Sequence, residues 1–410
     1  MKIILISSFY GLDGGGAGLI AEFLAKNWCQ AGHDVVVITL GHTHHSKPTR
    51  NDGIKFYRFS PFNLYPLDQK NSQPVWKRSI WQLIDIYNPH TALTLNEILS
   101  AENPDVINIQ KMRGFSGAVW SVSSKLYPGR VIQTCQDYES ISPIGTLEGR
   151  LGEWVKRRDW KLEPYRIIRR LLTKNISWVI SPSKFTLDQI VANGLFATAK
   201  EMVIPNTHGL TVENISARMQ AGTNQKHKDS PLTFLYLGRL EPEKGVQMLL
   251  DAFSSLSKSH SNIQLQIAGW GSLEQPLKQK WGQHSAIKFL GKVDGSEKDK
   301  ILSEMDVLIV PSTWPEVFGI VSVEALAFGK PVIASNAGGL PENITEGKTG
   351  WLFESGSVQS LQDRMEYAVH HSSILGEMSE NCFMAAKRYA VDEVAQEYLY
   401  LFEQVILARL

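Results

Sequence analysis

The chain has 410 residues, more than one hydrophobic core usually serves, so its length predicts two domains. The composition is that of a globular protein, and the net charge of +1 gives no general attraction to nucleic acid. Three widely spaced cysteines offer neither a disulfide framework nor a CxxC metal site, and no apolar run approaches the roughly 18 residues of a membrane span. We therefore expect a cytoplasmic protein.

The first half of the chain predicts an α/β fold. A glycine cluster that includes Gly14, Gly15 and Gly16 follows the first apolar run, and helical spacing follows the glycines. The spacing does not match G-x-G-x-x-G, so the cluster indicates close backbone approach to a ligand or to another domain. The apolar runs typical of buried parallel strands lie at residues 2–7, 34–40, 106–109, 131–134, 178–181 and 202–205.

Three segments of the first half allow more than one interpretation. His42, His44 and His45 could bind a metal ion, but no cysteine or carboxylate cluster lies near them, so we disfavour a metal site. Residues 60–80 are rich in Pro, Asn, Gln and Ser, and they predict a loop that lines a cleft. Residues 150–174 carry nine cations against three acids. They predict either an amphipathic helix pair with a solvated basic face or a surface that meets anionic lipid or an acidic acceptor.

A polar stretch at 205–230 has the composition of an interdomain linker, and the α/β pattern then restarts. The boundary predicts domains at 1–206 and 207–390, and the last helix, about 391–410, is long and amphipathic enough to return to the first domain. The strands predicted in the second half lie at residues 232–237, 263–268, 287–290, 307–310 and 332–334.

The stretch 311–341 organises the second half as strand, loop, helix and strand. Glu316 lies just before the helix that begins near Gly319, and Glu324 lies within it. Ligands of such βαβ units bind beyond the carboxyl ends of the strands, and anions favour the helix N-terminus. Two carboxylates beside free backbone N–H groups suit a ligand that carries hydroxyls and phosphates. The alternative is that both are ordinary helix charges.

Arg239 and Lys244 follow the strand at 232–237, so they project at the same edge of the sheet as Glu316. A diphosphate needs the two cations and a helix N-terminus, and sugar or ribose hydroxyls can use the two carboxylates. The sequence therefore predicts that all these groups converge on one ligand.

The second half resembles a family-4 retaining glycosyltransferase of the GT-B fold. The resemblance rests on an ordered set of short motifs that spans nearly all of residues 232–353, and the first half matches more loosely. The motifs are Gly238-Arg239, Glu243-Lys244-Gly245, Ala268-Gly269-Trp270-Gly271, Gly291-Lys292-Val293, Pro311-Ser312, Glu316-Val317-Phe318-Gly319 with Glu324, and Gly338-Gly339-Leu340-Pro341-Glu342.

The resemblance implies two Rossmann-like, doubly wound parallel-sheet domains that face each other across a cleft. The first would bind the acceptor and the second a nucleotide-diphosphate sugar. Arg239 and Lys244 would hold the diphosphate in place of a metal ion, Glu324 the ribose and Glu316 the transferred sugar. Further donor contacts are implied for Gly14, Gly15, Gly16, Gly269, Lys292, Val293, Phe318, Gly319, Ile320 and Val321.

One position departs from the family pattern. The family often has a T-x-H-D stretch whose His lies near the reacting sugar, whereas this chain has Gln136 there. A glutamine can hydrogen-bond a sugar hydroxyl but cannot carry a proton. The substitution bears on acceptor chemistry and leaves the implied donor site unchanged.

The resemblance implies a metal-independent, retaining hexosyltransferase that needs no cofactor. UDP-glucose is the favoured donor, and the acceptor is a glycan, a lipid-linked molecule or a small molecule, in envelope polysaccharide synthesis. Peripheral contact with the inner face of the membrane would suit such an acceptor. The alternatives are a non-catalytic sugar-nucleotide-binding partner of another transferase, which Gln136 favours, and a nucleotide-sugar 2-epimerase.

Overall fold

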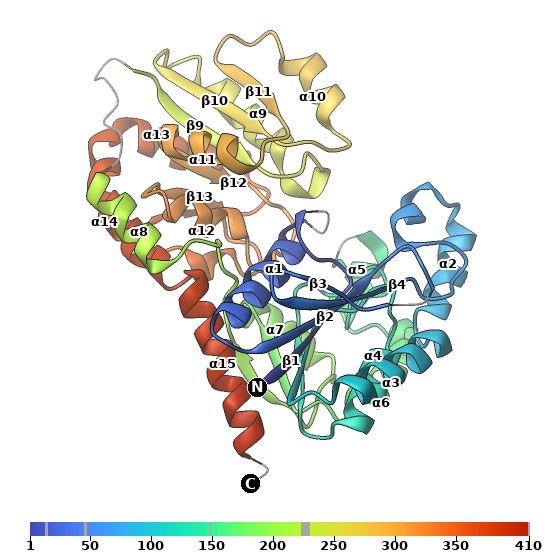
Figure 1. Cartoon of the computed structure of the whole chain (residues 1–410). Coiled ribbons are helices and arrows are strands. Elements are labelled where there is room, and N and C mark those ends of the chain that lie inside the picture. Colours follow the sequence, from blue (N-terminus) through green and yellow to red (C-terminus); the bar gives the residue numbers. More distant parts are fainter. Residues whose placement is uncertain (13–14, 45–46, 148, 223–229, 409–410) are drawn as a thin grey trace. The chain divides into compact units, whose positions relative to one another are not determined.

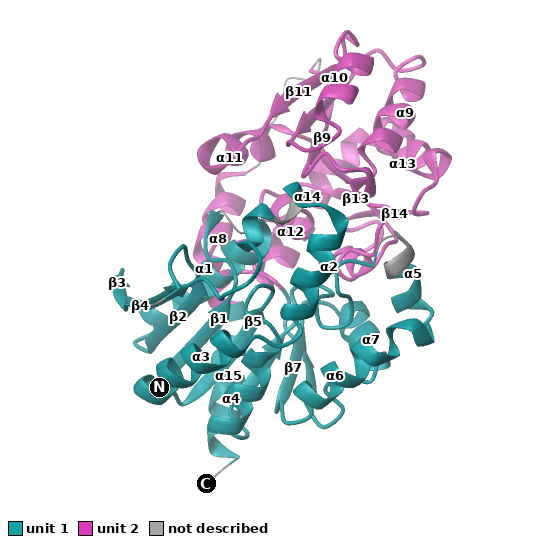
Figure 2. Ribbon diagram, turned by 90° about the vertical axis from the view of Figure 1, so that its right-hand side faces the viewer, with its two compact units in different colours: residues 1–205, 394–410 teal, residues 206–393 magenta. Residues whose placement is uncertain are grey.

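The computed structural model describes residues 1–12, 15–44, 47–147, 149–222 and 230–408, and the chain divides into two compact units (Figure 2). Unit 1 comprises Met1–Pro205 and Val394–Leu410, and unit 2 comprises Asn206–Glu393. The boundary predicted from the sequence lies one residue away. Each unit contains a sheet with helices packed on it (Figure 1), so the predicted α/β fold with two Rossmann-like domains is confirmed.

Unit 1 is built on an eight-stranded sheet in the order β3-β4-β2-β1-β5-β6-β7-β8. Neighbouring strands pair in parallel except β3 and β4, an antiparallel hairpin that was not predicted from the sequence. The central strands are buried runs of branched apolar residues, as expected where helices cover both faces. The strands are β1 Lys2–Ser7, β2 Asp34–Leu40, β3 Thr49–Asn51, β4 Ile54–Phe59, β5 Val106–Lys111, β6 Val131–Thr134, β7 Trp178–Ser181 and β8 Lys200–Val203.

The helices of unit 1 come mainly from its long first segment, and the last one comes from the C-terminal segment. They are α1 Gly15–Gln30, α2 Val75–Ile84, α3 Pro89–Glu102, α4 Ala118–Leu126, α5 Gly149–Lys156, α6 Glu163–Thr173, α7 Lys184–Ala192 and α15 Val391–Leu407. The strand order reverses between β1 and β5, since β2 follows on one side of β1 and β5 on the other. Open α/β sheets bind ligands at the carboxyl ends of strands beside such a reversal.

Unit 2 is built on a six-stranded, fully parallel sheet in the order β11-β10-β9-β12-β13-β14. Its order reverses between β9 and β12, which places the expected ligand site at the carboxyl ends of these two strands. The strands are β9 Leu232–Leu237, β10 Ile263–Ala268, β11 Ile287–Gly291, β12 Val307–Val310, β13 Val332–Ser335 and β14 Gly350–Phe353. The helices are α8 Val212–Ala221, α9 Val246–Leu256, α10 Glu274–Trp281, α11 Gly295–Glu304, α12 Ile320–Leu326, α13 Val358–His370 and α14 Ser372–Lys387.

Two segments predicted as loop or linker contain helices. Residues 60–80 include the start of α2, and the supposed linker 205–230 contains α8. The prediction of a linker was wrong because the polar residues of this segment cap the N-terminus of α8. Thr211 and Asn214 form a reciprocal capping box, in which each side chain accepts a hydrogen bond from the other residue's backbone N–H.

The chain crosses between the units twice, near Pro205 and near Glu393, and hydrogen bonds within unit 2 join the two connections. The Thr207 hydroxyl donates to the Tyr389 carbonyl over 2.8 Å, and the Val391 N–H donates to the Leu210 carbonyl over 2.9 Å. His208 lies buried between them. Its Nδ1 accepts from Leu210 N–H at 3.1 Å while Nε2 lies 3.0 Å from the Ala386 carbonyl, and burial lowers its pKa to about 4, so the ring is neutral.

The C-terminal helix α15 completes the core of unit 1. The Trp28 indole of α1 is fully buried and donates to the Ala395 carbonyl over 3.3 Å. Its ring lies edge-on to Tyr398 and Phe402, with centroids 5.7 and 5.1 Å away. The last helix thus packs on unit 1, as predicted, and this cluster of three aromatic rings forms the contact.

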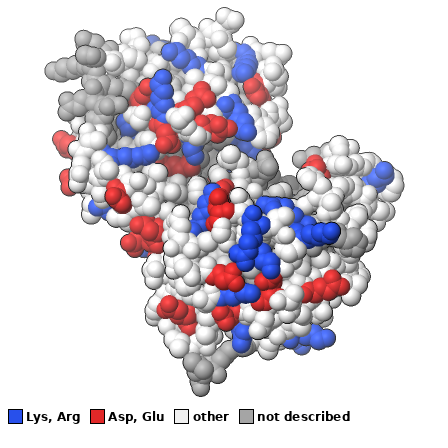
Figure 3. Space-filling view, in the orientation of Figure 1, with Lys and Arg blue, Asp and Glu red and all other residues white. Residues whose placement is uncertain are grey.

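Surface charges of both signs are interspersed over the face shown in Figure 3, in keeping with the net charge of +1. Among the described residues, no helix combines the length and apolar character needed to cross a bilayer.

Replacing Trp28 by Ala should lower the free energy of unfolding by about 3–5 kcal/mol, because it removes a large buried side chain and leaves a cavity against α15. Tyr400→Ala is the matched control, since Tyr400 lies on the exposed side of the same helix and its loss should cost about 0.5 kcal/mol or less. Urea denaturation followed by circular dichroism measures both. Equal losses would show that the aromatic cluster does not hold α15.

Candidate active site

The loops after β9 and β12 meet at the carboxyl edge of the unit 2 sheet. Lys244 lies in the first loop and Glu316 in the second, and Lys244 Nζ is 2.6 Å from Glu316 Oε1. The Ser312 hydroxyl donates to the same carboxylate oxygen over 2.5 Å. Both charged side chains are largely buried, so water screens their attraction only weakly. The structure therefore brings together the cation and the carboxylate that the sequence predicts to share a ligand.

Close backbone contacts hold the two loops in this register. Gly245 adopts a φ of +70°, and a Cβ atom there would lie 1.8 Å from the Pro311 carbonyl oxygen, so only glycine fits. Thr313 donates to the Glu243 carbonyl through its N–H at 2.9 Å and its hydroxyl at 3.1 Å. These contacts fix Lys244 and Glu316 relative to each other before any ligand is present.

A third loop, after β13, supports Glu316 from the other side. The Gly339 N–H donates to the Glu316 carbonyl over 2.7 Å, and Gly338 forms a bridge with Glu316. A Cβ atom at Gly338 would lie 2.2 Å from the Glu316 carbonyl oxygen. The Gly338-Gly339 pair of the sequence motif thus allows the chain to pass against the backbone of Glu316.

Arg239 lies in the same loop as Lys244 but does not reach Glu316. Its guanidinium forms a 3.3 Å ion pair with Glu243, and its side chain is 55% exposed. The ion pair is weak because both the exposure and the 3.3 Å distance favour exchange with water. Arg239 is therefore free to turn towards an anionic ligand at the end of β9.

Glu324 lies on α12 and pairs with Lys298 of α11, whose Nζ is 2.8 Å from Glu324 Oε1. Lys298 was not among the site residues predicted from the sequence. No short motif surrounds it, and only the packing of α11 beside α12 brings it to the carboxylate. The structure thus places each of the two predicted carboxylates against a lysine.

The start of α12 lies directly after Glu316. Gly319 has a φ of +82° and begins the helix, and the amide of Asn343 donates to the Phe318 carbonyl over 2.6 Å. The first N–H groups of a helix have no partner within it, so those of Ile320 and Val321 are suited to a polar ligand. Phe318 is buried and serves the core, while Ile320 and Val321 are half-buried.

The remaining predicted residues of unit 2 lie at the ends of β10 and β11. Gly269 lies so close to Gly238 that a Cβ atom would be 1.8 Å from the Gly238 carbonyl oxygen, and its N–H donates to Gly291 over 2.7 Å. Lys292 is exposed and 4.0 Å from Asp294, and Val293 is half-buried. They lie at the same edge of the sheet as Lys244 and Glu316.

In unit 1, Gly15 and Gly16 begin α1 and are exposed, whereas Gly14 lies outside the described residues. Gln136 is half-buried after β6. The next residue, Asp137, forms a 3.0 Å ion pair with Lys111, which fixes the loop that carries Gln136.

Unit 1 has a cavity of about 460 Å³ at the carboxyl edge of its sheet. It lies beside the strand-order reversal, since Tyr10 follows β1 and Gly114 follows β5. Its wall combines aromatic rings with polar and charged groups, which suits a polar ligand that has flat apolar faces. The wall includes Phe9, Tyr10, His42, Arg58, Tyr65, Asp68 and Trp81. The prediction that residues 60–80 line a cleft was the one sequence signal for this cavity.

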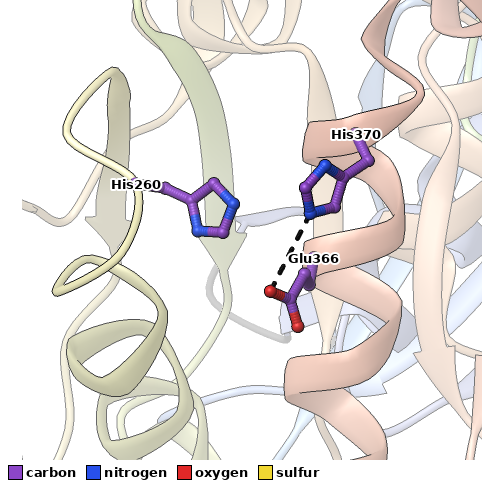
Figure 4. Close-up of side chains that lie close together, drawn as sticks. All are labelled: His260, Glu366 and His370. Atoms are coloured by element: carbon purple, nitrogen blue, oxygen red, sulfur yellow. Dashed lines mark ion pairs between the residues drawn. The ribbon is translucent and has the colours of Figure 1, made fainter.

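A separate group of possible metal ligands lies on the surface of unit 2 (Figure 4). His260, Glu366 and His370 place their ligand atoms within 4.8 Å of one another. His260 precedes β10, so the group lies at the amino edge of the sheet, opposite Lys244 and Glu316. Of the disfavoured histidine trio, His44 contacts the Ser60 carbonyl, His42 lines the cavity and His45 lies outside the described residues.

Two family matches together span most of the chain. Residues 15–207 match the family described as glycosyl transferase 4-like domain, and residues 220–388 match the family described as glycosyl transferases group 1. The boundary between the two matches falls close to the boundary between the two units.

The chain is also similar to individual proteins. An uncharacterized 42.6 kDa protein in the cps region of Klebsiella pneumoniae is 27% identical over 344 residues, 83% of this chain and 87% of that protein. Phosphatidyl-myo-inositol mannosyltransferase of Mycobacterium leprae is 34% identical over 204 residues, 49% of this chain and 53% of that protein. The structure of Anabaena Alr3699/HepE in complex with UDP-glucose superposes with a TM-score of 0.66 at 20% identity, covering 98% of this chain and 100% of that one. The two family matches and the shared fold lead to one conclusion: the chain belongs to the family-4-type glycosyltransferases of the GT-B fold.

Proposed function

We propose that the protein moves a hexosyl unit from a nucleotide-diphosphate sugar, with UDP-glucose favoured, to an acceptor hydroxyl with retention of anomeric configuration. The observation that carries this proposal is the Lys244–Glu316 pair at the strand-order reversal of unit 2. An ammonium group suits a diphosphate, and a carboxylate beside it suits the hydroxyls of the attached sugar. Alr3699/HepE, which has the same fold, is described in complex with UDP-glucose, and this supports the choice of donor.

The donor would lie along the carboxyl edge of the unit 2 sheet. Lys244 and Arg239 hold the diphosphate, together with the first N–H groups of α12. Glu316 accepts hydrogen bonds from the sugar and Glu324 from the ribose, where Lys298 keeps the Glu324 carboxylate in place. The backbone at Gly269, Lys292 and Val293 meets the base, since these residues end the adjacent strands β10 and β11.

In the transfer step, the bond between the sugar C1 and the β-phosphate oxygen breaks. The acceptor oxygen bonds to C1 from the same face, and its proton passes to the departing phosphate. Lys244 and Arg239 stabilise the negative charge that develops on that phosphate, which is where fixed cations lower a barrier most. No protein proton is required in this scheme, so Gln136 can replace the family histidine and hydrogen-bond a sugar hydroxyl.

The acceptor would bind in the cavity of unit 1. Phe9 and Tyr10 offer flat apolar faces to a sugar ring, and Arg58 and Asp68 can bind its hydroxyls. The name of the Mycobacterium leprae relative contains phosphatidyl-myo-inositol, which is a phospholipid. We therefore include a lipid-linked glycan among the acceptors, with a role in envelope polysaccharide synthesis.

The proposed donor is tested by thermal unfolding against UDP-glucose, UDP-N-acetylglucosamine, UDP-galactose and GDP-mannose. A ligand that binds only the folded state raises the melting temperature, and UDP-glucose should raise it most. The purified protein should also hydrolyse UDP-glucose slowly without an acceptor.

If another sugar nucleotide raised the melting temperature more than UDP-glucose, that sugar nucleotide would be the donor. No shift with any sugar nucleotide would contradict the donor site itself. Conversion of the donor to its 2-epimer would indicate an epimerase.

Replacing Lys244 by Ala should lower kcat/KM by roughly 100- to 1,000-fold, about 3 kcal/mol, because the charge that develops on the leaving diphosphate loses its nearest cation. Lys348→Ala, which removes an exposed lysine from another loop of unit 2, is the control and should keep full activity. Lys244→Arg, which preserves the charge, should recover part of the rate. Full activity in Lys244→Ala would exclude this lysine from the transfer step.

Donor binding and turnover should not change when a chelator such as EDTA is added, because Lys244 and Arg239 supply the countercharge that a metal ion would otherwise provide. Isothermal titration with UDP-glucose and initial rates, each with and without chelator, measure the effect. If the chelator abolished donor binding and turnover, and added manganese restored them, the proposal would be contradicted. A fall in melting temperature without loss of activity would instead indicate a structural ion at His260, Glu366 and His370.

A further inference from the structure

Helix α6 of unit 1 has its polar side turned inward. Arg166 and Arg169 are buried, whereas Ile167, Ile168 and Leu171 are exposed. The exposed fractions of Ile167 and Leu171 are 48% and 64%. The three apolar residues follow the i, i+1, i+4 spacing of one helix face. The solvated basic face predicted for residues 150–174 is therefore not found on α6, whose solvent-facing side is apolar.

The inward arginines are held by specific partners. Arg166 donates to the carbonyls of Arg158 and Asp159 over 3.0 and 2.7 Å and pairs with Glu163 at 2.8 Å. Arg169 lies over the rings of Trp120 and Tyr165, about 5 Å from each centroid. Turning the helix to hide its apolar face would break these contacts, so the outward position of Ile167, Ile168 and Leu171 is a stable property of the fold.

The segment that contains this apolar face also carries exposed cations and an exposed tryptophan. Trp160, just before α6, is 76% exposed. Between residues 152 and 174 the structure describes five exposed cations and one exposed acid, Glu153, so the exposed charge of this segment is positive. The cations are Lys156, Arg157, Arg158, Lys161 and Lys174.

Helix α2 also presents apolar residues to solvent. Gln82 of α2 and Arg169 of α6 line one small cavity. Trp81 of α2 is buried, whereas Trp76 and Leu83 are more than half exposed. Helix α2 and the segment that ends with α6 thus each present apolar residues and an exposed tryptophan to solvent.

We propose that α6, with the segment before it, is a docking surface for an anionic lipid bilayer. Apolar side chains on one helix face enter the acyl boundary, tryptophan favours the interface, and lysines and arginines attract anionic headgroups. The excess of exposed cations in this segment favours an anionic bilayer over a second copy of the chain, because a second copy would bring five like charges against five. The inference goes beyond the proposed function and does not depend on it, since docking needs neither donor nor acceptor.

Vesicle sedimentation of the full-length protein tests the surface. Vesicles of phosphatidylcholine with phosphatidylglycerol should carry the protein into the pellet at low salt, and high salt should release a large part of it. Vesicles of phosphatidylcholine alone should bind several-fold more weakly. Protein that stays in the supernatant with the anionic vesicles at low salt would overturn the proposal.

Variants locate the contact. Ile167→Gln/Leu171→Gln should weaken binding to anionic vesicles by roughly tenfold or more, because two apolar side chains no longer enter the bilayer. Arg157→Gln/Lys161→Gln should also weaken binding by roughly tenfold and reduce its dependence on salt. Melting temperatures of all variants show that they fold.

Matched controls come from unit 2. Val358→Gln/Met384→Gln removes two exposed apolar residues, and Lys258→Gln/Lys348→Gln removes two exposed lysines. Both should bind vesicles as the unmodified protein does. Equal binding by the α6 variants and their controls would overturn the proposal. The proposal would also be overturned if light scattering showed that the unmodified protein is a dimer, that the Ile167→Gln/Leu171→Gln variant is a monomer, and that neither binds vesicles.

Discussion

The ion pair between Lys244 and Glu316 ties together the two loops on which the donor site of unit 2 depends. Removing one partner of such a shielded pair leaves the other charge without compensation, which costs several kcal/mol. The pair therefore stabilises the loops and also keeps a cation and a carboxylate ready at the end of the sheet. When a diphosphate enters, Lys244 can exchange one anionic partner for another, because Ser312 still donates to the Glu316 carboxylate.

Glycines make this arrangement possible at the two places where backbones touch. Gly245 lies against Pro311, and Gly338 lies against Glu316, each too close for any side chain. The three loops after β9, β12 and β13 are thereby stacked without space between them. The site is rigid where it holds charges, whereas Arg239, which is exposed and weakly paired, can adjust to the ligand.

Most of the fold and much of the site could be predicted from the sequence. Buried parallel strands are continuous apolar runs, and the motif residues lie directly after them, so Lys244 and Glu316 were expected to converge. Lys298 was missed because packing between helices places it, and no local pattern records that packing. Helix α8 was missed because its asparagine and threonine form the cap. The spacing in α6 predicts two faces, but only the partners of Arg166 and Arg169 decide which face points inward.

The aromatic cluster of Trp28, Tyr398 and Phe402 has a consequence for synthesis of the protein. Unit 2 is one continuous segment, so the ribosome delivers all of it before the C-terminal helix α15 emerges. The first 205 residues of unit 1 are synthesised early, but Trp28 finds its aromatic neighbours only when α15 is made, after unit 2. The N-terminal half therefore waits with part of its core open while the second half folds, so the order of folding reverses the order of translation.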